Sequence, residues 1–361
     1  MKKLIRTILI TLLVSVFAFG IVGCNDQNAS SGSEKGLILK RYENEDFYTV
    51  YDYVDDGKTS SLTITSPDEL PIGRIAENAF DGVNSLTELV IPNTVTEIGK
   101  GAFKNMKNLN KLTVPFIGLN ATADAYFNQT QSGIDKAVDA TRTISHFFGE
   151  EEYVGGVMVT NNYNKNGSTS VYLPATLNTI TLNNASEYAI PMYAFSGVIN
   201  LGTVNLSDKI TAIGVSAFEG CLGLANVKIS ASVKTIYDSA FSGCTNLGNL
   251  TFADNQTVDT FGDKAFYGIA LKNFTIPASV TTLGEMCFAN SNLRVVNLSN
   301  VTKIGWACFA NCEKLNTISA VNSVELSHYA FYKCKQLTDT GIANLTYTNG
   351  DFAFIDSGVN A

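Results

Sequence analysis

An Ala-Phe dipeptide recurs along most of this 361-residue chain, and its spacing limits the folds that the chain can adopt. Where units adjoin, successive Phe residues are 21 to 25 positions apart, and Cys-Phe replaces Ala-Phe in two units. The residues are Phe80, Phe103, Phe195, Phe218, Phe241, Phe266, Phe288, Phe309, Phe331 and Phe354. A fixed period of roughly 20–50 residues is typical of solenoids, in which each coil buries its apolar side against the next.

Alignment on the Phe residues shows further apolar positions in each unit. They lie eight and five residues before the Phe and three, six, nine and eleven after it, as in Val95, Ile98, Met106, Leu109, Leu112 and Val114 around Phe103. The alternation that ends the unit predicts a short strand with one buried face. A Gly four residues before the Phe, at Gly99, Gly214, Gly262, Gly284 and Gly305, indicates a corner with positive φ or close backbone approach. We therefore expect a mainly β repeat solenoid of about 23-residue coils with a spine of Phe side chains.

Two segments follow a known repeat closely. Leu86 to Phe103 reads LTELVIPNTVTEIGKGAF, and Leu271 to Phe288 reads LKNFTIPASVTTLGEMCF. Both resemble the BspA-type leucine-rich repeat, and the resemblance extends from about Pro71 to the C-terminus. It implies a leucine-rich-repeat array over residues 68–361. It also implies a surface protein that binds host extracellular-matrix proteins or other bacteria.

Residues 37–67 precede the repeats and are expected to form an N-terminal β cap. Alternating aromatic and Val residues from Phe47 to Tyr53 come before an Asp56-Gly57 turn, and this pattern resembles the β-hairpin cap of such arrays. A cap is needed because the first coil would otherwise expose its apolar side to solvent.

The repeat is weak between Phe103 and Phe195, which are 92 residues apart, four times 23. Phe148 with Val154, Val157 and Val159 fits one coil, and Val171 with Leu177, Ile180 and Leu182 fits another. We expect a continuous solenoid with one degenerate coil or insert near residues 120–143.

Residues 1–23 are expected to be a lipoprotein signal peptide. Lys2, Lys3 and Arg6 precede an apolar run, and Ile21 to Cys24 resembles a lipobox, which implies cleavage before Cys24 and lipidation of its thiol. Two acyl chains there would anchor the exported chain to the outside of a membrane, with residues 24–36 as a flexible tether. The alternative is an uncleaved membrane anchor. Cleavage would change the formal net charge from −8 to −11, which disfavours nucleic acid as a partner.

Catalytic and metal-binding motifs are lacking in the sequence. The two histidines, His146 and His328, lie in separate units, and no known nucleophile or phosphate-loop motif is present. Asn162-x-Asn164-x-Asn166 has calcium-loop spacing but no carboxylate, so a plain loop is favoured. We expect a non-enzymatic protein without metal or cofactor. An unrecognised hydrolase is a remote alternative.

Six cysteines occupy positions that apolar residues hold in other units, which indicates core packing. Cys221 and Cys244 would be neighbours in the stack, as would Cys312 and Cys334, at a distance that permits a disulfide. Their parallel side-chain directions disfavour one, and the sequence leaves both states open.

Two surfaces are candidate binding sites for a protein or glycan ligand. The outward strand positions form a polar, nearly neutral face, and the residues singled out on it are Asn205, Asn226, Lys228, Asn249, Thr251, Asn273, Thr275 and Asn297. Asn226, Asn249 and Asn273 could instead form an amide ladder with a purely structural role. The second surface is an aromatic ridge of Trp306, His328 and Tyr332. Adhesion or recognition is the favoured function, and an envelope scaffold that self-associates through the repeat ends is the alternative.

Overall fold

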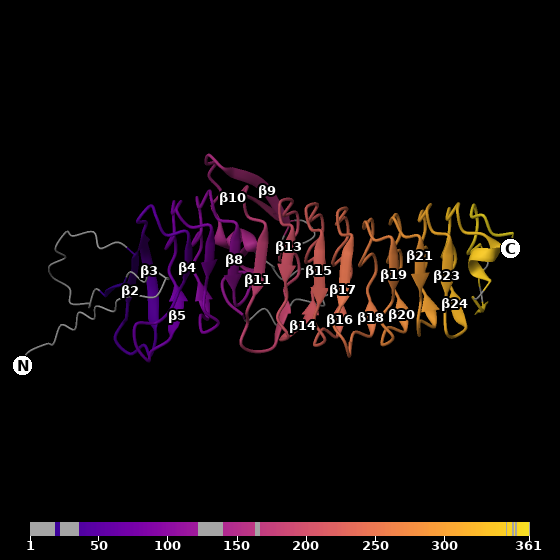
Figure 1. Ribbon diagram of the computed structural model, residues 1–361, viewed down its shortest axis with the longest axis horizontal. Coiled ribbons are helices and arrows are strands. Elements are labelled where there is room, and N and C mark those ends of the chain that lie inside the picture. The colour runs from indigo at the N-terminus through magenta and orange to yellow at the C-terminus, as the bar shows by residue number, and fades with distance from the viewer. Residues whose placement is uncertain are drawn as a thin grey trace, which may run out of the picture.

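The protein is an elongated β-solenoid whose coils follow one another along the rod in sequence order, from indigo to yellow (Figure 1). The computed structural model describes residues 19–21, 36–121, 140–162, 167–343, 345–348, 350 and 352–360. The expected mainly β repeat solenoid is confirmed. Among the described residues, no helix has the length and apolar character needed to cross a membrane.

One side of the rod is made by the strands that follow each Phe. We call the first of these sheets the front sheet: it is parallel and holds β4 (Ser61–Thr63), β6 (Glu88–Val90), β8 (Lys111–Val114), β11 (Thr179–Leu182), β13 (Thr203–Asn205), β15 (Asn226–Ile229) and β17 (Asn249–Phe252). A separate parallel sheet, the second front sheet, continues the same side with β19 (Asn273–Thr275), β21 (Val295–Asn297) and β23 (Thr317–Ser319). In both sheets apolar residues point inward, and the outward positions are mostly polar, with Val295 of β21 as an exposed apolar exception.

A second side is made by the shorter strands before each Phe, which we call the back sheet. It runs through β12 (Tyr188–Ile190), β14 (Ile210–Ile213), β16 (Thr235–Ile236), β18 (Thr260–Phe261), β20 (Thr282–Leu283), β22 (Lys303–Ile304), β24 (Val324–Leu326) and β25 (Tyr347–Thr348). Nearer the N-terminus, a sheet of β1 (Phe19–Ile21), β2 (Gly36–Lys40), β3 (Tyr48–Val54), β5 (Ile72–Ile75) and β7 (Glu97–Ile98) takes this place.

The third side is a run of turns that carries the spine of Phe side chains. Phe218 lies between Phe195 and Phe241, with ring centroids 4.8 and 5.1 Å away and nearly parallel planes. The stack continues through Phe266, Phe288, Phe309, Phe331 and Phe354 at 5.3 to 5.6 Å. The backbone runs in step with it, since the Phe218 amide donates to the carbonyl of Ala240 in the next coil at 2.8 Å.

The expected glycine corner is a site of close backbone approach. A Cβ on Gly214 would lie 2.6 Å from the carbonyl oxygen of Ile190 in the preceding coil, so only Gly fits. Positive φ occurs elsewhere, at the residues two before and two after each spine Phe, as at Ser216 and Gly220.

The N-terminal hairpin pairs β2 with β3 in antiparallel register. Its turn lies between Lys40 and Tyr48, not at the predicted Asp56-Gly57 turn, which instead leads from β3 to β4. β4 pairs in parallel with β6 and so already belongs to the front sheet.

The weak-repeat region differs from the prediction. β8 pairs directly with β11, so the 68 residues from Leu112 to its partner Ile180 make one enlarged coil. The prediction of a coil through Phe148, Val154, Val157 and Val159 is wrong, because β9 (Gly156–Asn162) and β10 (Ser168–Pro174) pair with each other in an antiparallel hairpin.

The other residues of the enlarged coil also differ from the predicted regular coil. Val154, which was predicted to hold an apolar coil position, is 91% exposed. The short helices η1 (Ala140–Arg142) and η2 (Ile144–Phe147) precede the hairpin, and Phe147 takes the spine position, 5.4 Å from Phe103. The strand predicted around Ile180 is present as β11. Most of the predicted insert near 120–143 lies outside the described residues.

Candidate functional site

The predicted strand residues all lie on the outer surface of the two front sheets, which we call the strand face. Asn226 and Lys228 of β15 alternate with buried Val227 and Ile229, so their side chains point to solvent. The same alternation exposes Asn205, Asn249, Thr251, Asn273, Thr275 and Asn297. The result is a long polar surface. On it, Lys111 Nζ lies 3.9 Å from Glu88 Oε2.

Amide contacts run along part of this face. The Asn249 Nδ2 donates to Asn226 Oδ1 at 3.1 Å, and the Asn205 Nδ2 donates to Thr181 Oγ1 at 3.0 Å. The predicted ladder of Asn226, Asn249 and Asn273 does not continue through the strands, because β17 and β19 belong to different sheets. The amides of the strand face are thus only partly engaged with each other.

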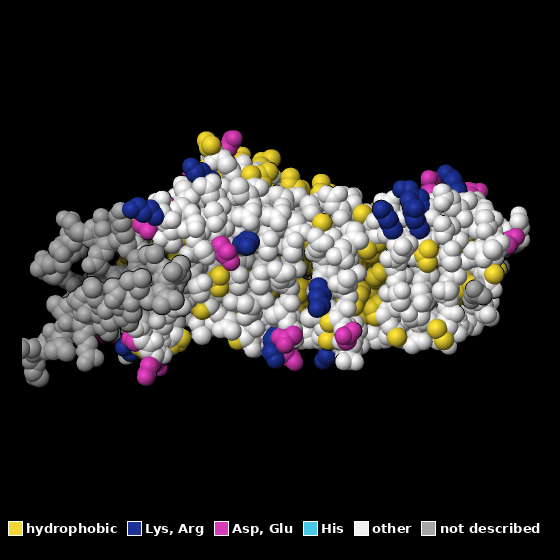
Figure 2. Space-filling view, viewed as in Figure 1, with side chains coloured by type: hydrophobic (Ala, Val, Ile, Leu, Met, Phe, Trp, Pro, Cys, Tyr) yellow, Lys and Arg dark blue, Asp and Glu magenta, His cyan; other side chains and the backbone are white. Residues whose placement is uncertain are grey.

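A groove of about 690 Å³ opens where the front sheet ends and the second front sheet begins. Figure 2 shows hydrophobic side chains gathered at this junction on a mainly polar face. Its apolar wall includes Phe252 and Phe274, whose ring centroids are 6.1 Å apart with planes tilted by 44°. We call this feature the front groove.

The front groove arises from a change in repeat length. The unit from Phe241 to Phe266 has 25 residues, and the next one, to Phe288, has 22. The longer unit places Asn255 and Gln256 in a loop after β17, and strands of unequal coils then fail to pair. The groove was not predicted from the sequence, although the jump in spacing and the Phe at position 252, where the neighbouring coil carries Ile229, were visible signals.

The predicted aromatic ridge is present and longer than expected. Trp306 is 44% exposed and meets Tyr329 edge to face at 6.4 Å, and Tyr329 meets Tyr332 at 5.8 Å. Phe352, which the prediction did not include, lies 6.2 Å from the His328 ring and 6.3 Å from that of Tyr329. The structure thus brings Trp306, His328 and Tyr332 into one cluster on the turn side of the rod, in which Tyr332 is half-buried.

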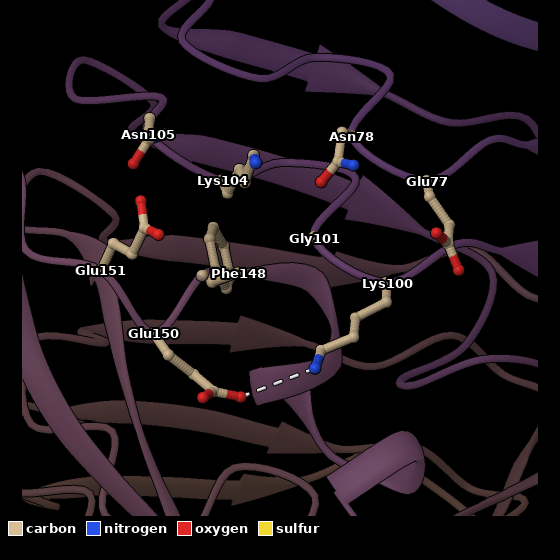
Figure 3. A pocket seen from close by; sticks show the side chains of 10 residues that line it. Glu77, Asn78, Lys100, Gly101, Lys104, Asn105, Phe148, Glu150 and Glu151 are labelled. Atoms are coloured by element: carbon tan, nitrogen blue, oxygen red, sulfur yellow. Dashed lines mark ion pairs between the residues drawn. The ribbon is translucent and has the colours of Figure 1, made fainter.

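A smaller pocket of about 280 Å³ lies on the turn side near the N-terminus (Figure 3). Phe148 lies at its centre, and Lys100 pairs with Glu150 at 3.6 Å across one edge. Both partners of this ion pair are more than half exposed, so it contributes little stability.

The six described cysteines are buried free thiols in the core, as their positions predicted. Cys221 Sγ donates to the Phe195 carbonyl at 3.1 Å, and Cys244 and Cys312 donate likewise to the carbonyls of Phe218 and Phe288. Burial raises the pKa of Cys244 and of Cys312 to about 12. A protonated buried thiol is a poor nucleophile, so these cysteines act as packing residues.

The two histidines lie in different parts of the solenoid. His146 is buried, with its Nε2 2.9 Å from the carbonyl oxygen of Ile98, whereas His328 is exposed in the aromatic ridge. Within the described ranges, no cluster of three or more His, Cys, Asp or Glu residues is placed to hold a metal ion. Cys24, Asn164 and Asn166 lie outside the described residues.

Three solved structures are similar to this chain. A leucine-rich repeat protein from Bacteroides ovatus is 22% identical, with a TM-score of 0.47, covering 91% of this chain and 81% of its own. A leucine-rich cell surface protein from Faecalibacterium prausnitzii is 20% identical, with a TM-score of 0.34 and coverage of 93% and 96%. The pneumococcal vaccine antigen PcpA is 16% identical, with a TM-score of 0.26 and coverage of 83% and 72%.

A comparison with curated protein sequences gives no significant match. The family described as the BspA type leucine-rich repeat region matches this chain in six copies, over residues 56–146, 165–294 and 259–360. The matched segments include the Phe spine, both front sheets and the back sheet. Because they span most of the chain, the protein belongs to the BspA-type leucine-rich-repeat family.

Proposed function

We propose that this protein is a non-catalytic recognition or adhesion module, displayed on a cell surface, that binds a protein or glycan ligand through the strand face. The observation that carries the proposal is the row of exposed polar side chains on β13, β15, β17, β19 and β21, which the exposed Val295 and the front groove interrupt. Solenoids of stacked repeats use such extended regular surfaces for binding. Leucine-rich-repeat proteins generally bind proteins, and two of the similar structures are a cell surface protein and a vaccine antigen.

The strand face is tested with a triple charge substitution. In Asn226→Lys/Asn249→Lys/Asn273→Lys, three exposed amides become cations. We expect the affinity of the full chain for extracellular-matrix proteins or arrayed glycans to fall at least tenfold. The reason is that three positive charges replace amides that can hydrogen-bond a ligand. Surface plasmon resonance measures the affinity and circular dichroism the fold.

The matched control carries three lysines on the back sheet. Thr235→Lys/Thr260→Lys/Thr282→Lys places them in one register row, whose next member is the natural Lys303. This variant should bind like the wild type. Equal loss in both variants would indicate a nonspecific charge effect, and retained binding in the strand-face variant would contradict the proposed site.

Lipid anchoring at Cys24 is the second part of the proposal. It is supported by the Lys and Arg residues before an apolar run and by the lipobox-like Ile21 to Cys24. In Cys24→Ala we expect the protein to lose metabolic labelling by a fatty acid and to leave the membrane fraction, because two acyl chains supply the anchor. Cys221→Ala, which alters a buried thiol, is the control and should keep the label. Labelled Cys24→Ala protein would exclude this anchor.

A further inference from the structure

We infer that the front groove between β17 and β19 binds an uncharged oligosaccharide. This inference rests on the proposed function and names the ligand class for one part of the strand face. The groove has a volume of about 690 Å³, inside the range of roughly 300–1,000 Å³ that holds small ligands. It is lined mainly by residues from the coils of β17 and β19 and from the loop after β17, with Ser299 added from the coil of β21.

Two polar groups in the groove have no partner in the described part of the chain. The Gln256 Nε2 donates to the carbonyls of Ile229 and Ala253, but its Oε1 is buried without a hydrogen bond. Ser279 Oγ is buried and unpaired as well. Buried polar groups in native proteins are nearly always satisfied, and both side chains line the groove, so rotation of either group toward the groove would let a ligand supply its missing partner.

The lining chemistry selects the class of ligand. Phe252 and Phe274 offer ring surface, and the ring faces carry partial negative charge that attracts C–H groups. Amides and hydroxyls of Asn255, Asn273 and Thr275 surround the rings, and none of the lining residues is charged. A sugar ring has C–H faces with hydroxyls on its edge, and each hydroxyl can donate and accept a hydrogen bond. Such a lining fits a neutral sugar and offers no counter-charge to a phosphate, sulfate or carboxylate.

An inserted peptide strand does not fit the groove. The same two coils remain paired in the back sheet through β18 and β20, and Phe241 and Phe266 stay 5.6 Å apart in the spine. An extra strand needs about 4.8 Å on each side. The groove is therefore a wedge that opens only toward the strand face, and a ligand enters it from that face.

The test uses the full chain on an array of uncharged hexose and N-acetylhexosamine oligosaccharides, with sialylated and sulfated counterparts. We expect uncharged glycans to bind. In Ser279→Ala, affinity for the same glycan should fall about tenfold, as expected for one lost hydrogen bond. The melting temperature should not fall, since the hydroxyl has no internal partner. Ser319→Ala on β23 is the matched control and should leave both values unchanged.

Any other outcome contradicts the inference that the front groove binds an uncharged oligosaccharide. Binding of no uncharged glycan, or only of acidic ones through exposed Lys272 and Arg294 outside the groove, excludes a neutral sugar site. Unchanged glycan affinity in Ser279→Ala excludes the groove. The proposed function fails separately: it is contradicted only if the strand-face lysine variant keeps full binding to every ligand found, protein or glycan.

Discussion

The free energy of unfolding is expected to fall steeply above about pH 8.5, where thiols of an unfolded chain ionise. Burial raises the folded-state pKa of Cys221, Cys244, Cys287, Cys312 and Cys334. The stabilisation is fully present below the pKa that these thiols have in the unfolded chain. It is lost as the pH rises from that value toward the pKa of the thiols in the folded protein, because in this range only the unfolded chain releases thiol protons. Each such thiol contributes about 1.4 kcal/mol per pH unit, so five contribute about 7 kcal/mol per unit. Most domains have total stabilities of about 5–15 kcal/mol.

Urea unfolding in a reducing buffer, followed between pH 7 and 11, measures this slope. The control is Cys221→Val/Cys244→Val/Cys312→Val/Cys334→Val, because Val83 and Val198 hold the same repeat position in other coils. Removing four of the five titrations should flatten most of the alkaline slope while stability at pH 7 changes much less. An equal slope in both proteins would show that Tyr and Lys ionisation, not the thiols, causes the loss.

The regular part of the fold followed from the sequence because each coil carries its own pattern. The Phe residue, the apolar positions around it and the Gly corner recur, so one unit predicts the next, and burial of Phe218 and Leu224 matches that pattern. The positive φ of Tyr193 and Met286 could not be predicted, because the coil path imposes it on residues that rarely adopt it.

The enlarged coil shows where a local pattern stops being informative. Val157 and Val159 are two positions apart, like the inward-facing residues of a front-sheet strand, but β9 pairs with β10 in antiparallel register. Alternation of buried and exposed positions determines which face of a strand is buried, but it does not determine which other strand it pairs with. The 92-residue spacing was consistent with four regular coils, and the structure has two steps, Phe103 to Phe147 and Phe147 to Phe195.

The strand face was predictable residue by residue, whereas the front groove was not. Exposure of Asn226 or Thr251 follows from alternation within one strand. The groove depends on a mismatch between two neighbouring coils, and the unpaired Ser279 Oγ depends on the three-dimensional course of the loop. Such a site appears in the sequence only as an irregular repeat length.

Truncation of a central spine residue is expected to destabilise the array far more than truncation at its end. Phe218→Ala should cost about 3–5 kcal/mol, because it leaves a cavity and removes stacking on both Phe195 and Phe241. Phe354 is 7% exposed and stacks on Phe331 at 5.3 Å, so Phe354→Ala should cost clearly less. Urea unfolding monitored by circular dichroism measures both values.

The double variant Phe218→Ala/Phe241→Ala tests whether the spine acts through contacts between neighbours. The two rings are stacked with planes 3° apart, so part of the cost of each single variant is their shared contact. The double variant should therefore cost about 0.5–1.5 kcal/mol less than the two single costs combined, the usual coupling of an aromatic pair. Phe218→Ala with Phe331→Ala is the matched pair without contact and should be additive. Additivity in both pairs would mean that each Phe is stabilised by its own coil, and that the solenoid is not a chain of coupled neighbours.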